Sequence, residues 1–183
     1  ACPIEPRSYL GQYDSIKDQY TLWSSTQAPH LVRKYFTNSM RIPEHKLRVI
    51  APDVGGGFGM KLYHYPEEPT VLWAAKVLGK PVRWTGTRSE SLVSDTHARD
   101  HFTLGKIAFD SNGKILAMSF RTLAAYGAYE GQFQASIANA YHFCLLSCGY
   151  DIPAIYAEIK GVYTNATPVD AFRGAGRPEA VYQ

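Results

Sequence analysis

The chain has 183 residues, a formal net charge of +3 and a hydrophobic fraction of 45%. This length and composition suit one sizeable domain or two closely packed subdomains, and they give no sign of disorder. The basic residues are scattered, with Arg33 and Lys34 the only adjacent pair, so we expect no nucleic-acid-binding surface.

Cysteine content and apolar runs bear on the compartment. Three cysteines form no disulfide framework in a chain of this length and fit a reducing compartment. No apolar run approaches the roughly 20 residues of a membrane span, and no signal segment opens the chain. We expect a cytoplasmic protein without a membrane span, with the periplasm as the alternative. The chain lacks an initiator Met, and the pattern of a further helix starts at Pro178, only a few residues before the last residue, Gln183. We therefore expect an excerpt of a longer polypeptide.

The first half mixes short strands and helices. In chain order we expect extended segments over 10–23 with a turn near 14–15, a helix over 31–40, a strand over 46–50, a helix over 66–78, a strand over 82–84 and a helical turn over 89–94. The apolar residues that recur at helical spacing in the two longer helices are Leu31, Tyr35 and Phe36, then Val71, Leu72, Ala75 and Val77.

The second half opens with a hairpin pattern. In chain order we expect paired strands over 101–109 and 114–124, a loop over 127–132, an apolar helix over 135–148, a strand over 157–163 and a long loop over 164–177. Because helices and strands mix without regular βα alternation, we predict an α+β fold with mixed sheets and packed helices. We divide it into residues 1–98 and 99–183, with no independent linker.

A glycine cluster follows the strand over 46–50. Val54-Gly55-Gly56-Gly57-Phe58-Gly59-Met60-Lys61 offers bare backbone against which a flat or anionic ligand could lie. Neither the dinucleotide fingerprint nor the phosphate-binding P-loop fits, because both need glycine where Met60 stands. A plain glycine-rich turn is the alternative. Phe58 favours a functional loop, since a bulky aromatic between glycines is poor turn chemistry.

Three segments, in order along the chain, resemble motifs of the molybdenum hydroxylases, the xanthine dehydrogenase and aldehyde oxidase family. The glycine cluster is similar to that family's Gly-Gly-Gly-Phe-Gly-Gly-Lys signature and departs from it only at Met60. Ser25-Thr26-Gln27 resembles the Ser-Thr-Gln motif upstream, and Ala171-Phe172-Arg173-Gly174 resembles the arginine loop downstream. The N-terminal segment 1–7 and the hairpin ending in Gly127-Ala128-Tyr129 also resemble the family, so the likeness covers nearly the whole chain.

The resemblance implies a molybdopterin cofactor, in a dinucleotide form, that carries molybdenum. It places Gln27 against a ligand oxygen of the metal and Phe58 beside the metal, although a local hydrogen bond at a helix start is an alternative role for Gln27. Gly56, Gly57 and Gly59 would donate backbone hydrogen bonds to the cofactor. Arg173 and the neighbouring Gly174 would lie near the metal in the arginine loop.

Arg173 is the catalytic candidate that the resemblance implies. A guanidinium there would stabilise negative charge that develops on a substrate carbonyl or ring nitrogen. The alternative is that Arg173 only pairs with a carboxylate such as Asp170. The family's general base is a glutamate that has no match among these residues. Glu67 and Glu68 look instead like acids in the first turn of a helix, so the isolated chain should be inactive.

The substrate pocket departs from that of xanthine dehydrogenases. Leu62 stands where xanthine dehydrogenases have a purine-binding glutamate. Tyr141 stands near the position of their purine-contacting arginine, and Ala175 stands where they have an aromatic residue that packs on the purine. These changes predict a roomier, less polar pocket for an aldehyde or an N-heteroaromatic compound. The arginine loop is also similar to the glycine version found in the large subunit of aerobic carbon monoxide dehydrogenases. Carbon-monoxide-oxidising members have a copper-binding cysteine where this chain has Gly174, so carbon monoxide is not the expected substrate.

The expected function is therefore that of a molybdopterin-binding subunit in a hydroxylase that takes its oxygen from water. Electrons would pass to a 2Fe-2S partner and an FAD partner, as separate subunits or fused domains, and we expect a dimer of heterotrimers. The alternatives are a nucleotide-binding protein that uses the glycine loop and a cofactor-free structural relative.

Cysteines and histidines in the second half suggest no metal site. Cys144 and Cys148 are spaced for one helix face among apolar neighbours, so we expect buried structural thiols. His97 and His101 are expected to be solvated surface histidines.

Overall fold

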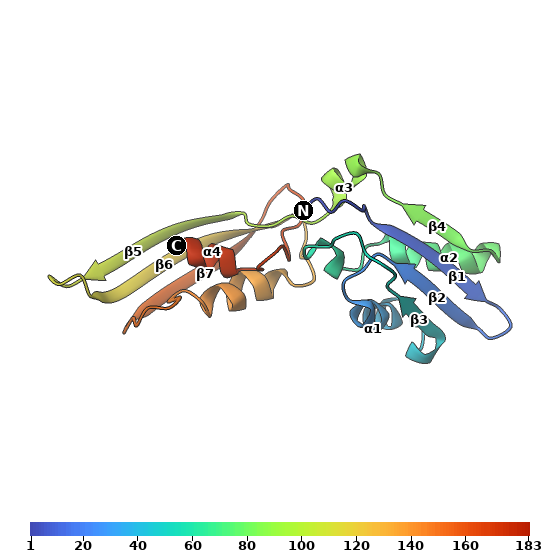
Figure 1. Ribbon diagram of the computed structural model, residues 1–183, viewed down its shortest axis with the longest axis horizontal. Helices are drawn as coiled ribbons and strands as arrows, with labels where there is room; N and C mark the ends of the chain where they lie inside the picture. Colours follow the sequence, from blue (N-terminus) through green and yellow to red (C-terminus); the bar gives the residue numbers. More distant parts are fainter. The chain divides into compact units, whose positions relative to one another are not determined.

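The computed structural model describes the backbone of residues 1–183 and the side chains of residues 1–137 and 141–183. It consists of two compact units, unit 1 (residues 1–95) and unit 2 (residues 96–183), which are described separately (Figure 1). Each unit has its own sheet and helices, so the expected α+β class is confirmed. The functional division after residue 98 stays a prediction. Within the described part of the chain, no helix has the length and apolar character to cross a membrane.

Unit 1 is a four-stranded sheet with two longer helices. Its elements are β1 (Ser8–Asp14), β2 (Gln19–Ser24), α1 (Pro29–Ser39), η1 (Glu44–Lys46), β3 (Leu47–Ile50), η2 (Met60–Leu62), α2 (Glu67–Leu78), β4 (Val82–Thr85) and α3 (Arg88–Ser94). The strand order is β3-β2-β1-β4, in which β1 runs antiparallel to β2 and β4 while β2 runs parallel to β3.

The core of unit 1 lies on one face of this sheet. Strand residues alternate between buried and accessible positions, as expected for a sheet covered on one face. The buried cluster joins residues of the strands, of α1 and of α2: Tyr9, Tyr20, Leu22, Val32, Phe36, Ile42, Leu47, Val71 and Leu72. Helix α2 comes so close to β1 that a β-carbon on Gly11 would lie 2.6 Å from the carbonyl oxygen of Val71. The sheet and α2 therefore form a rigid support for the loops at the strand ends.

Two helix faces differ from the sequence-based expectation. Helix α1 begins at Pro29 rather than Leu31, and its buried residues are Val32 and Phe36. In α2 the prediction was wrong for Val77, which is 62% exposed and lies two residues before the left-handed Gly79 that caps the helix. At about 100° per residue, Val77 points away from the face of α2 that carries the buried Val71, Leu72 and Ala75, so it faces solvent rather than the sheet.

Unit 2 is a three-stranded sheet with helical segments. Its elements are β5 (His101–Phe109), β6 (Ile115–Gly127), the π-helix η3 (Ser136–Tyr141), β7 (Ile155–Tyr163) and α4 (Arg177–Tyr182). The strand order is β5-β6-β7, with β5 antiparallel and β7 parallel to β6. Parallel strands need a long crossover, and residues 128–154 supply it. Phe120 of β6 packs with Leu146 of the crossover and Ala180 of α4 in a small core.

Two expectations about the crossover and the start of β5 were wrong. The apolar helix expected over 135–148 is a π-helix over its middle and ends in turns after Phe143. As a result Cys144 and Cys148 are exposed rather than buried. His101 is not a solvated histidine either, because its ring lies 5.6 Å, centre to centre, from the fully buried ring of His142.

Candidate functional site

The glycine loop connects β3 to η2 in unit 1. Three of its residues have positive φ angles: Gly56 at 91°, Phe58 at 56° and Gly59 at 98°. Glycine adopts such angles freely, but a phenylalanine does so at a steric cost. The ring of Phe58 is nonetheless 44% exposed, so burial of this ring does not offset the cost. A strained, exposed aromatic in a loop is a common mark of a functional position.

Gln27 holds the loop from the side. The side-chain Oε1 of Gln27 accepts a 2.9 Å hydrogen bond from the backbone N–H of Gly59. The backbone N–H of Gln27 donates to the carbonyl of Lys61. A β-carbon on Gly57 would lie 2.2 Å from the same Oε1. Only glycine at position 57 therefore allows the amide of Gln27 to lie flat against the loop. Since Oε1 is occupied, the Nε2 end of this amide is the one that can donate to a ligand.

Some backbone N–H groups of the glycine loop donate hydrogen bonds within the chain itself. The N–H of Gly56 donates to the carbonyl of Val54, and the N–H of Gly59 is engaged by Gln27. Two of the three donors expected to face the cofactor are therefore engaged within the chain itself. Leu62, expected to line the substrate pocket, closes η2 by donating to the carbonyl of Gly59.

The segment before Gln27 is fixed by side chains. The hydroxyl of Ser25 accepts from the backbone N–H of Ser8, and the hydroxyl of Thr26 donates to the carbonyl of Lys61. Ser24 is hydrogen-bonded at 2.6 Å to the carboxyl of Glu68, which is fully buried. Burial raises the pKa of the Glu68 carboxyl to about 8, although the hydrogen bonds from Ser24 and from the backbone of Tyr65 act in the opposite direction. Glu68 is therefore protonated at neutral pH.

The arginine loop lies in unit 2, ahead of α4. Asp170 is buried at its start, where its carboxylate accepts hydrogen bonds from the backbone N–H groups of Phe133 and Ala171. Burial raises the pKa of Asp170 to about 6 despite these donors. This side chain anchors the loop to the crossover through backbone groups. Arg173 follows at an exposed position.

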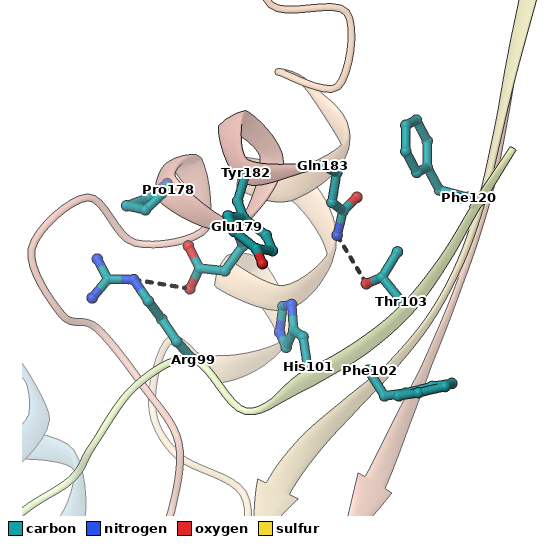
Figure 2. A pocket seen from close by; sticks show the side chains of 10 residues that line it. Arg99, His101, Phe102, Thr103, Phe120, Pro178, Glu179, Tyr182 and Gln183 are labelled. Atoms are coloured by element: carbon teal, nitrogen blue, oxygen red, sulfur yellow. Dashed lines mark hydrogen bonds and ion pairs between the residues drawn. The ribbon is translucent and has the colours of Figure 1, made fainter. Parts of the chain in front are cut away.

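Arg99 holds the loop beside Arg173. Its Nη2 donates to the carbonyls of Phe172 and Arg173, and its guanidinium lies 4.8 Å from the ring centre of Phe172. Figure 2 shows Arg99 reaching toward Glu179 of α4, with 3.7 Å between Nε and Oε1. Arg99 thus ties the loop to the helix that follows it.

Arg99 and Glu179 both line the pocket whose side chains are drawn in Figure 2. Arg99, His101, Thr103 and Glu179 line it together with apolar residues, and Gln183 donates a 2.8 Å hydrogen bond to Thr103. Burial lowers the pKa of His101, so its imidazole is neutral at pH 7. The positive charge that pairs with the Glu179 carboxylate in this pocket is therefore that of Arg99.

Three residues after Arg173 have left-handed backbone. Gly174, Ala175 and Gly176 have φ angles of 108°, 46° and 88°, and Gly176 is the N-cap of α4. A β-carbon on Gly174 would lie 2.6 Å from the ring of Pro178. Position 174 therefore excludes a side chain both by its φ angle and by this contact. Tyr141, from the crossover, lies under the guanidinium of Arg177 at 5.0 Å.

The expected site residues fall into two groups. Gln27 and the glycine loop, with Leu62 close behind, lie together in unit 1. Arg173, Gly174 and Ala175 lie together in unit 2, and Tyr141 is near Gly176, whose β-carbon would come 3.1 Å from that of Tyr141. Convergence of the two groups on one metal centre stays a prediction. Among residues 1–137 and 141–183, no three His, Cys, Asp or Glu side chains gather as a metal site.

Sequence patterns missed several residues that hold these loops. Lys61 appeared only as the end of a motif, and Glu5 only as part of a proline-containing N-terminal segment. Arg99 carried no signal, because it lies 74 positions from Arg173 in sequence. Glu67 and Glu68 do lie in the first turn of α2, as expected, but the burial of Glu68 was not foreseen.

Comparison with known proteins places both groups in one family. A family model described as the molybdopterin cofactor-binding domain matches residues 1–183. The carbon monoxide dehydrogenase large chain of Hydrogenophaga pseudoflava is 38% identical over 99% of this chain, which spans 23% of that protein. The nicotine 6-hydroxylase large subunit of Paenarthrobacter nicotinovorans is 35% identical over 96% of this chain, which spans 22% of it.

A solved structure agrees with this assignment. The crystal structure of quinoline 2-oxidoreductase from Pseudomonas putida 86 superposes with a TM-score of 0.91 and 37% identity, covering 96% of this chain and 22% of that one. A match over every residue does not favour the alternatives of a nucleotide-binding protein or a cofactor-free relative. The chain belongs to the molybdopterin cofactor-binding domain family of the molybdenum hydroxylases.

Proposed function

We propose that the chain is part of the molybdopterin-binding subunit of an enzyme that hydroxylates an aldehyde or an N-heteroaromatic compound with water as the oxygen source. The observation that carries this proposal is the pairing of Gln27 with the glycine loop. The loop fixes the Gln27 amide with Oε1 inward, against the N–H of Gly59. With Oε1 directed inward, the Nε2 group is left to donate a hydrogen bond to an oxygen atom on a bound group.

The residues of unit 1 fit the cofactor that the family implies. Gln27 would donate to an oxygen ligand of the metal, and the exposed ring of Phe58 would lie beside the metal. Gly57 is buried against the Gln27 amide, where it would support that amide and offer its backbone N–H. Gly56 and Gly59 would shape the loop more than donate to the cofactor, since their N–H groups are engaged. When bound, the molybdenum cofactor supplies the two-electron redox chemistry.

Arg173 would stabilise the substrate as negative charge develops on its carbonyl oxygen or ring nitrogen. A guanidinium keeps its charge at any physiological pH and presents several donors in a plane. The carbonyls of Phe172 and Arg173 are fixed by Arg99, so the backbone from which this side chain projects is held in place. Gly174 would complete the cofactor-facing part of the loop.

The substrate class rests on three positions and on one exclusion. Leu62, Tyr141 and Ala175 would line a pocket with few hydrogen-bonding groups, which suits an aldehyde or an aromatic ring. Two similar proteins are named for nicotine and for quinoline, both N-heteroaromatic compounds. Carbon monoxide is not proposed, although similar large chains bear its name, because residue 174 has no side chain to anchor copper.

The partners follow from the proposed reaction. Hydroxylation with water as the oxygen source removes two electrons from the substrate, and we propose a 2Fe-2S partner and an FAD partner as their route. The proposed assembly is a dimer of heterotrimers in the cytoplasm, and the proposed pterin is a dinucleotide. Relatives named as a large chain, or as a subunit of a dehydrogenase complex, support an assembly of several subunits.

The test is to express the full-length gene with its neighbouring subunits and to measure molybdenum, pterin and iron in the purified protein. We expect molybdenum and pterin together, and reduction of an artificial dye with aldehydes or N-heteroaromatic compounds but not with carbon monoxide. Folded, active enzyme that lacks both molybdenum and pterin would refute the proposal.

A further inference from the structure

Lys61 is a lysine buried inside unit 1. Its side chain is 0% exposed, and its Nζ lies 2.7 Å from Oε2 of Glu5. A buried ammonium group needs a paired negative charge, because an unpaired one would lose its hydration without compensation. Glu5 supplies that charge from the N-terminal segment, 56 positions away. The pKa of Glu5 lies below its usual value, although burial opposes this, because the Lys61 ammonium and the Gly55 amide stabilise its charged form.

The same carboxylate holds the first glycine of the loop. Oε2 of Glu5 accepts a 2.8 Å hydrogen bond from the backbone N–H of Gly55, and the N–H of Glu5 donates to the carbonyl of Gly55 at 3.2 Å. A β-carbon on Gly55 would lie 2.4 Å from that of Glu5. One carboxylate oxygen therefore joins both ends of the glycine loop, Gly55 at its start and Lys61 at its end.

The backbone of Lys61 extends this arrangement to Gln27. The carbonyl of Lys61 accepts hydrogen bonds from the N–H of Gln27 at 2.9 Å and from the hydroxyl of Thr26 at 3.2 Å. Lys61 thus connects three separate stretches of chain: the N-terminal segment by its side chain, the glycine loop by its position and the Ser-Thr-Gln segment by its carbonyl.

We propose that Glu5 and Lys61 are positioning residues for the cofactor, acting as an ionic latch that sets the glycine loop and Gln27 in their binding geometry. The inference rests on the proposed function and adds the N-terminal segment to its machinery. Neither residue needs to touch the cofactor. Glu5 closes the loop, and the Gln27 amide is then held against Gly57 and Gly59 in a fixed orientation.

The test compares four variants of the full-length subunit, Glu5→Ala, Glu5→Gln, Lys61→Met and Glu44→Ala, produced in a host that makes the cofactor. Glu5→Ala removes the charge and the acceptor for Gly55, while Lys61→Met keeps the length of the side chain but removes its charge. Glu44→Ala is the matched control, because Glu44 forms an exposed ion pair with Arg33 at 3.3 Å in the same unit. Molybdenum and pterin per folded subunit are measured before and after extended dialysis, with the melting temperature recorded alongside.

We expect cofactor affinity to fall about 10- to 100-fold in Glu5→Ala and Lys61→Met, as is typical when residues that orient a ligand shell are changed, so both should lose molybdenum and pterin on dialysis. Glu44→Ala should retain them. The Glu5→Gln variant keeps an oxygen acceptor for Gly55 without the charge, so it should retain more cofactor than Glu5→Ala.

Two outcomes overturn the inference. One is a lower melting temperature in Glu5→Ala and Lys61→Met with unchanged cofactor retention, which would make the pair purely structural. The other is equal loss of cofactor from the Glu44→Ala control. Absence of molybdenum and pterin from the wild-type subunit is a different result, since it refutes the proposed function itself. If Lys61→Met fails to fold, the comparison of Glu5→Gln with Glu5→Ala decides.

Discussion

Gln27 and Gly57 are in such close contact that any side chain at position 57 would overlap the Gln27 amide, with 2.2 Å from a β-carbon to Oε1. The amide lies against the loop because position 57 is bare, and its hydrogen bond to the N–H of Gly59 keeps it there. Two positions that are 30 apart in sequence therefore act as one unit.

Gly57→Ala and Gly57→Val should displace the side chain of Gln27 rather than unfold unit 1, because the overlapping atoms belong to a flexible side chain. We expect either variant to lose cofactor to the same extent as Gln27→Ala. The double variant Gly57→Ala/Gln27→Ala should be no worse than Gln27→Ala alone, since both changes remove the same interaction. The measurement is molybdenum per subunit.

A suitable control is Gly149→Ala in unit 2, where an added β-carbon meets nothing within 4 Å. Additive losses from the two changes in the double variant would contradict the coupling of Gln27 with Gly57.

Arg173→Ala should lower kcat by about 10²- to 10³-fold, the usual cost of removing one donor to a developing negative charge. Molybdenum and pterin content should stay at the wild-type level. Arg121→Ala is the comparison, because Arg121 is a largely exposed arginine in the same unit. Steady-state kinetics of the complete enzyme measure the effect, and a wild-type kcat in Arg173→Ala would remove this residue from the mechanism.

Arg99→Ala should free the backbone of the arginine loop at Phe172 and Arg173. We expect kcat to fall about tenfold with a small change in KM, because the substrate still binds but the guanidinium of Arg173 is less well placed. Arg99→Lys should not restore kcat, since an ammonium group cannot hold two carbonyls, the Phe172 ring and Glu179 together. Full recovery in Arg99→Lys would show that only the charge matters.

Stability should depend on pH through Glu68. Its pKa is about 8 in the folded chain, against an ordinary value of 4.5. Between these pH values the folded state keeps a proton that the unfolded state releases, so stability falls as pH rises from 4.5 to about 8 and then levels off. Glu68→Gln, which resembles the protonated side chain, should remove this contribution, which is on the order of a few kcal/mol.

Chemical denaturation of wild type and Glu68→Gln at several pH values checks this expectation. The informative quantity is the difference between the two proteins, which cancels the titration of other groups. A difference that stays constant from pH 5 to about pH 8 would contradict a raised Glu68 pKa.

Local patterns predicted the elements better than the contacts between them. The hairpin over His101–Phe109 and Ile115–Gly127 follows from alternation around a turn with Asp110 and Gly113, and the structure confirms it. Val77 and Cys144 lie in apolar patterns yet are exposed, because Val77 lies on the outer face of α2 and Cys144 lies in the turns that follow the helical segment.

The candidate site was predictable where its function depends on residue type and motif order, as for Gln27 and the glycine loop. The residues that hold these loops were not predictable from local sequence. Glu5 and Lys61 are far apart in the chain, and so are Arg99 and Arg173. Their importance comes from hydrogen bonds to backbone carbonyls and amides, which leave no trace in sequence spacing.

The packing of Gly174 against Pro178 constrains how this arginine loop could change during evolution. A relative that acquired a metal-binding thiol at position 174 would have to relieve a positive φ angle and make room beside the proline ring at the same time. A single Gly174→Cys change therefore meets both a steric clash with Pro178 and a backbone angle that disfavours a side chain.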